Sequence, residues 1–66
     1  MSRGECEFQP DCSDPSEAVV HAQWTLFDFV EHEVCGAHVG HMVQALERTR
    51  VDGYAALGIW AVWYDE

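Results

Sequence analysis

The sequence predicts a small α+β domain in which a β-hairpin is followed by one helix and a C-terminal strand, the order ββαβ. Segments 18–34 and 54–64 have the composition of strands, whereas the apolar residues of segment 36–49 recur at helical spacing. Three cysteines and one histidine are also spaced so that they can surround one Zn²⁺ ion. Such a cross-link matters in a chain of 66 residues, because small domains bury too little surface to be comfortably stable.

The composition is that of one folded and strongly acidic domain. Apolar residues make up 48% of the chain and aromatic residues 12%, which is too rich for a disordered protein. Twelve acidic residues against three arginines give a formal net charge of -9. A field of this sign repels phosphate groups, so we expect no direct nucleic-acid binding and no anionic membrane as a partner. Basic protein partners are favoured instead.

We expect the protein to be cytoplasmic. Its first 17 residues are polar and acidic, unlike a signal peptide. The longest strongly apolar stretch, 54–64, has 11 residues and is far shorter than a transmembrane helix. An odd number of cysteines argues against a closed disulfide framework, and reduced cytosolic thiols favour metal ligation.

Residues 1–5 are predicted to be a flexible tail, and residues 6–66 a single zinc-stabilised domain. Segment 6–16 is rich in Pro, Asp and Ser, so it is predicted to be a loop that curls around a metal ion. Segment 18–24 is predicted to be a strand, and one of its faces is formed by Ala18, Val20, Ala22 and Trp24. Segment 29–34 is predicted to be its antiparallel partner, although no Asn-Gly or Asp-Gly pair marks the turn at 25–28.

From residue 36 to residue 49 the apolar period becomes helical. One stripe, at spacing i, i+3, i+4 and i+7, is formed by Val39, Met42, Val43 and Leu46. Gly40 costs about 1 kcal/mol relative to Ala inside a helix, so we expect it to mark close packing. Arg48 and Arg50 suit the negative end of the helix dipole, and Asp52-Gly53 ends the helix.

The last predicted strand, 54–64, is apolar on both faces. One face carries Ile59, Ala61 and Trp63, and the other carries Trp60, Val62 and Tyr64. A single helix covers only one face of a sheet, so either this is a central strand with a loop over its second face or one face is an interface. For the interface we select Trp60, Val62, Trp63 and Tyr64, which would contact another protein or form a homodimer.

The metal ligands are predicted to be Cys6, Cys12, Cys35 and His38, in the pattern C-x5-C, 22 residues, C-x2-H. On an ideal helix, positions three apart differ by about 60° and about 4.5 Å, so Cys35 and His38 converge at the helix start. His41 lies about 120° from Cys35 and is the poorer ligand by the same geometry. His32, three residues before Cys35, is the least favoured alternative to His38. We expect the metal-bound sulfur to accept the unpaired N–H groups of the first turn.

This arrangement resembles small treble-clef-like zinc-finger proteins of bacteria and phages. The matching residues are Cys6, Cys12, Ala18, Cys35 and His38, within a resemblance that spans about residues 6–49. The resemblance implies zinc binding at the three cysteines and His38. The sequence departs from the family pattern in its first ligand pair, which five residues separate where two to four are usual. The C-terminal strand also lies outside the match.

Four protein ligands would complete the coordination of one structural zinc ion, and no nucleophile or phosphate-loop motif is present in the sequence, so we expect no enzyme. The favoured function is a zinc-binding interaction module with an accessory or regulatory role. An alternative is an acidic inhibitor or nucleic-acid mimic, since Glu5, Glu7, Asp11, Asp14 and Glu17 gather around the first two cysteines. A weaker alternative is a redox or metal-sensing switch, because thiolates are oxidisable.

Overall fold

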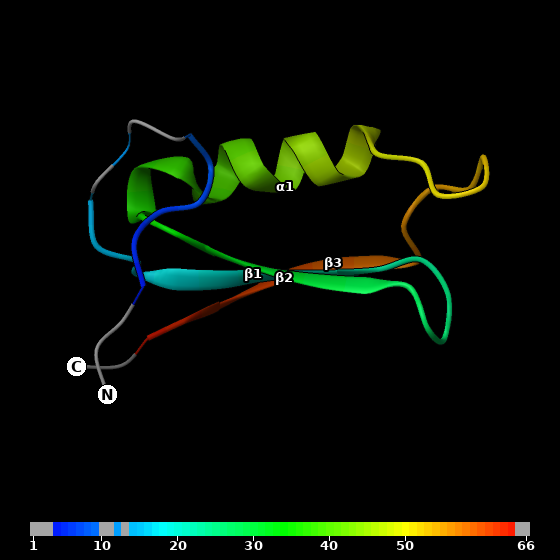
Figure 1. Cartoon of the computed structure of the whole chain (residues 1–66), viewed down its shortest axis with the longest axis horizontal. Helices are drawn as coiled ribbons and strands as arrows, with labels where there is room; N and C mark the ends of the chain where they lie inside the picture. Colours follow the sequence, from blue (N-terminus) through cyan, green and yellow to red (C-terminus); the bar gives the residue numbers. More distant parts are fainter. Residues whose placement is uncertain (1–3, 10–11, 13, 65–66) are drawn as a thin grey trace.

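In the computed structural model, which describes residues 4–9, 12 and 14–64, an α-helix lies across one face of a three-stranded antiparallel sheet (Figure 1). The strands are β1 (Ala18–Gln23), β2 (Phe29–Val34) and β3 (Gly58–Trp63). A 3-10 turn, η1 (Gly36–His38), leads into α1 (Val39–Arg48). The predicted α+β fold and the ββαβ order are therefore confirmed. The last strand begins at Gly58 rather than at residue 54, and the helix begins with a 3-10 turn.

Strand β1 is the centre of the sheet, in the order β2-β1-β3. Its register pairs Val20 with His32 on one side and with Ala61 on the other. The predicted apolar face of this strand is confirmed, because Ala18, Val20, Ala22 and Trp24 are all buried. A central strand has neighbours on both edges and a helix above it, and this explains why its inward side chains are buried.

Helix α1 packs its predicted stripe against this face. Met42 and Leu46 are buried, and Val39 and Val43 are partly buried against the same core. The indole N–H of Trp24 donates to the carbonyl of Thr49 at 3.3 Å, which ties the end of β1 to the end of the helix. The side chain of Arg50 donates to the carbonyl of Glu47 at 2.6 Å, as expected for a cation at the negative end of a helix.

The turn between β1 and β2 is closed by side chains rather than by a glycine. The hydroxyl of Thr25 donates to the Asp28 carboxylate at 3.0 Å and accepts the backbone N–H groups of Phe27 and Asp28 at 3.2 and 3.1 Å. This Thr–Asp closure replaces the missing Asn-Gly signal. It leaves Leu26 and Phe27 at the tip of the turn, 78% and 86% exposed.

Strand β3 lies at the edge of the sheet, so its interpretation as a central strand covered by a loop is wrong. Ile59 and Ala61 face the helix and are partly buried against the core. Trp60, Val62 and Trp63 are 47%, 52% and 53% exposed.

No helix among the described residues is long and apolar enough to cross a membrane.

The prediction that Gly40 marks close packing is wrong. Gly40 is exposed, and a Cβ atom added there would have nothing within 4 Å. Gly36 differs, because a Cβ atom at that position would lie 3.2 Å from Oε1 of Glu17.

We therefore expect Gly40→Ala to stabilise the domain by about 1 kcal/mol, since it removes the entropic cost of a helical glycine without a clash. For a domain of this size the melting temperature should rise by about 4–8 °C. Thermal circular dichroism at a fixed zinc concentration measures the shift. Gly36→Ala is the matched control and should give no gain, and a destabilising Gly40→Ala would contradict the open packing of this position.

Candidate metal centre

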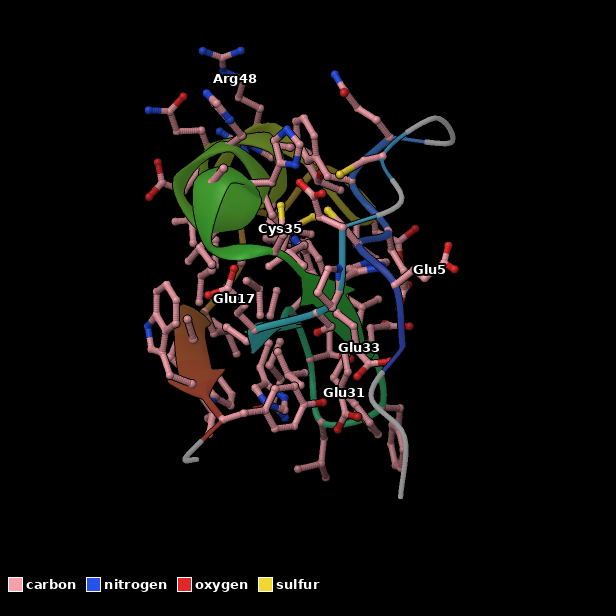
Figure 2. The ribbon with its side chains drawn as sticks, turned by 90° about the vertical axis from the view of Figure 1, so that its left-hand side faces the viewer. Glu5, Glu17, Glu31, Glu33, Cys35 and Arg48 are labelled. Atoms are coloured by element: carbon pink, nitrogen blue, oxygen red, sulfur yellow. The ribbon has the colours of Figure 1, made fainter. Side chains whose placement is uncertain are left out.

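The four predicted ligands come from three separate parts of the chain. Cys35 directly follows β2, and the backbone N–H of His38 donates to its carbonyl at 3.0 Å, which fixes the 3-10 turn. Cys6 lies in the N-terminal segment and Cys12 in the loop that follows. Figure 2 shows Cys35 between the helix and the sheet, at the end where the chain passes from one to the other.

The N-terminal segment is held in place by backbone hydrogen bonds. The N–H of Cys6 donates to the carbonyl of Asp14 at 3.0 Å, and the N–H of Glu7 donates to the carbonyl of Glu33 at 2.7 Å. Gly4 and Glu5 pair with Ser16 and Pro15. Positions 1–3 of the predicted tail, together with positions 10, 11 and 13 of the predicted loop, lie outside the described residues. The described backbone therefore carries Cys6 to the start of the helix.

The four ligand atoms all lie within 4.8 Å of one another. Nδ1 of His38 is 3.2 Å from Sγ of Cys35, 3.4 Å from Sγ of Cys6 and 3.5 Å from Sγ of Cys12. The sulfur atoms of Cys12 and Cys35 are 4.0 Å apart. A tetrahedral zinc ion with its usual bond lengths would separate sulfur from nitrogen by about 3.6 Å and two sulfurs by about 3.8 Å. These four distances are therefore close to those of a tetrahedral site.

Hydrogen bonding alone does not account for this convergence. An imidazole nitrogen carries either one hydrogen or one lone pair, so Nδ1 of His38 cannot bond three thiols at once. A disulfide is also absent between Cys12 and Cys35, because bonded sulfurs are about 2.05 Å apart. A cation at the common centre would satisfy all four donors, and sulfur with imidazole is the ligand set of zinc.

The cysteine pKa values diverge within the cluster. Burial raises the pKa of Cys6, but hydrogen bonds from the backbone of Cys35 and Phe8, and from the His38 side chain, outweigh burial and lower it to about 6. For Cys12 the backbone of Asp14 lowers the pKa, but burial and the neighbouring sulfurs raise it to about 11. One thiolate therefore disfavours a second, and a bound cation would remove this repulsion.

Two residues that support the cluster were missed by the sequence analysis. Sulfur was predicted to accept the unpaired N–H groups of the first turn, but the N–H of Gly36 donates to Oε1 of Glu17 at 3.1 Å. The Cys6 sulfur accepts a backbone hydrogen bond from Cys35. The ring of Phe8 stacks on the His38 imidazole, with centroids 5.0 Å apart and planes at 20°. The Glu17 contact spans 19 positions of sequence and leaves no local pattern that could have signalled it.

Neither alternative histidine belongs to the cluster among the described residues. The ring of His41 lies 5.7 Å from those of Phe8 and His38, outside the group of ligand atoms. Nδ1 of His32 lies 3.4 Å from a carboxylate oxygen of Glu7.

Comparisons with protein-family models, with curated proteins and with solved structures give no match for this chain. Of the predicted resemblance to treble-clef-like zinc fingers, the structure shows the clustering of Cys6, Cys12, Cys35 and His38 and the helix that follows them.

We expect His38→Ala to lose the metal and His41→Ala to retain it, because only His38 contributes to the cluster. The loss should exceed the roughly 10–100-fold in affinity that removal of an outer hydrogen-bond partner costs. Zinc titrations followed by circular dichroism compare the two variants. Equal effects of the two substitutions, or a larger effect of His41→Ala, would show that the ligand set is wrong.

Proposed function

We propose that this protein is a small structural zinc module that acts by contact with a partner protein, without catalysis. The observation that carries the proposal is the convergence of Cys6, Cys12, Cys35 and His38, whose ligand atoms all lie within 4.8 Å of one another. Four protein ligands fill the tetrahedral coordination of zinc, whereas catalytic zinc sites keep one position for water or substrate.

The position of the cluster suits a structural ion. Zinc bound here would join the N-terminal segment, the loop, the end of β2 and the start of the helix. Cys6 and Cys35 are themselves buried members of the core. Binding of structural zinc contributes about 10–16 kcal/mol in zinc-finger peptides, whereas a core of this size rarely supplies more than about 3–5 kcal/mol. Folding would then depend on the metal.

Contact with a partner is supported by the exposed apolar side chains of β3. Trp60 and Val62, on the face turned away from the helix, and Trp63, on the opposite face, are each about half exposed. Tryptophan is enriched at the energetic centres of interfaces. Tyr64, the fourth selected residue, is half-buried and donates its hydroxyl to Glu33 of β2 at 2.6 Å, so it offers a partner less apolar surface than the other three. The partner in this proposal is another protein or a second copy of the chain.

The acidic-mimic alternative receives less support. Of the acidic residues around the first two cysteines, Glu17 binds the backbone of Gly36, and Glu7 binds the backbone of Glu33 and faces His32. These carboxylates serve the chain's own structure, and fewer remain to imitate a phosphate backbone. We therefore favour the interaction module.

We expect native mass spectrometry to find one Zn²⁺ per chain and a strong chelator to unfold the protein, since metal and fold are coupled. Circular dichroism should show loss of structure with the chelator and recovery when zinc, but not magnesium, is added, because magnesium prefers oxygen ligands. Cys35→Ser should behave like the chelated protein. A folded protein with a metal-free mass would refute the proposal.

A further inference from the structure

The face of the sheet turned away from α1, which we call the open face, carries a row of aromatic and ionisable side chains. Directly paired residues of neighbouring strands share a face, so Trp60, His21 and Glu31 form one row across all three strands. The parallel row at the hairpin end contains Gln23 and Phe29. This row of indole, imidazole and carboxylate lies on the side opposite the helix.

A hollow of about 210 Å³ lies in the open face beside this row. Its walls include His21, Leu26, Phe29, Glu31 and Trp60. Leu26 projects from the Thr25–Asp28 turn, and Phe29 is exposed at the start of β2. The hollow therefore has aromatic and aliphatic walls and one carboxylate.

The contacts of His21 show how a flat polar group packs beside the hollow. The imidazole of His21 stacks on the indole of Trp60, with centroids 5.3 Å apart and planes at 12°. Nδ1 of His21 lies 3.7 Å from Oε1 of Glu31. A planar group that stacks on the indole and points nitrogen at the carboxylate matches this environment. The guanidinium of arginine has that shape and those donors, together with a permanent charge.

The charge distribution also selects a basic occupant. The described arginines, Arg48 and Arg50, lie at the end of α1, whereas Glu31 and Glu33 lie on the open face. Figure 2 shows Arg48 on the helix side and the two glutamates on the other side of the sheet. With a net charge of -9 the protein attracts cations and repels its own copies.

We propose that the hollow on the open face binds an arginine side chain from a basic segment of a partner protein. The guanidinium takes the place of the His21 imidazole, stacks on Trp60 and pairs with Glu31, while Leu26, Phe27 and Phe29 pack against an apolar neighbour of that arginine. This inference rests on the proposed interaction function and names the chemistry of its partner. Lysine fits less well, because its ammonium lacks the flat face that stacks on an indole.

The test uses the full-length, zinc-loaded protein and a panel of fluorescent ten-residue peptides. Each peptide places one to three arginines next to leucine or phenylalanine, in all arrangements, with serine elsewhere. Matched peptides carry lysine, glutamate or citrulline in place of arginine, and citrulline keeps the shape of arginine without its charge. Fluorescence anisotropy measures each dissociation constant.

We expect the best arginine peptide to bind about tenfold more tightly than its citrulline partner. Trp60→Ala and Glu31→Gln should each remove most of that difference. Tyr54→Ala is the matched control, since Tyr54 is an exposed aromatic residue outside the walls of the hollow, and it should leave binding unchanged.

Three results would overturn the inference: no arginine preference across the panel, equal loss of binding in Tyr54→Ala, or a dimer that Trp60→Ala dissociates. A native mass spectrum of each sample separates the two proposals. Arginine binding by a folded, metal-free protein would refute the zinc module alone, whereas a zinc-loaded protein that ignores arginine would refute the arginine site alone.

Discussion

The convergence of three sulfur atoms on Nδ1 of His38 is the constraint on which the rest of the structure depends. It brings together segments that are far apart in sequence, at the point where the sheet passes into the helix. Thiols forced this close cannot all ionise without a compensating charge, as the opposite pKa shifts of Cys6 and Cys12 indicate. Without a metal ion Cys12 would therefore keep its proton at neutral pH, and a bound cation would allow all three sulfurs to ionise together.

The elements of the fold could be predicted from the sequence because each has a local signal. The strand alternation at Val20 and the helical spacing of Met42 and Leu46 depend only on side-chain period, and burial follows it. The histidine of the cluster was also predictable, because the short step from Cys35 to His38 is governed by helical geometry. The contact of Glu17 with Gly36 was not, since it depends on how β1 lies beside the end of β2. The edge position of β3 was not predictable either, because local composition does not determine the order of strands in a sheet.

Two apparent anomalies of the sequence have one cause. A hairpin turn with Leu26 and Phe27 at its tip, and a last strand with Trp60 on its outer side, both break the rule that exposed positions are polar. The Thr25–Asp28 closure and the edge position of β3 bring Leu26 and Trp60 to the walls of one hollow, with the exposed Phe27 beside Leu26 at the tip of the turn. Departures from the polar pattern that gather in one place are more informative than scattered ones, because isolated exposed apolar residues are ordinary.

The cluster and the hollow lie toward opposite ends of the hairpin, and this separation has a consequence for regulation. Ala18 and Val34 pair beside Cys35, whereas Gln23 and Phe29 pair beside the turn, about 17 Å away along β1. On the proposed zinc site and arginine site, zinc at one end would contact no residue at the other, so zinc supply would set how many molecules are folded but not how tightly each folded molecule binds arginine. Low zinc would then reduce the amount of folded, binding-competent protein and leave its affinity for the partner unchanged. Zinc would control the concentration of active molecules and not their dissociation constant.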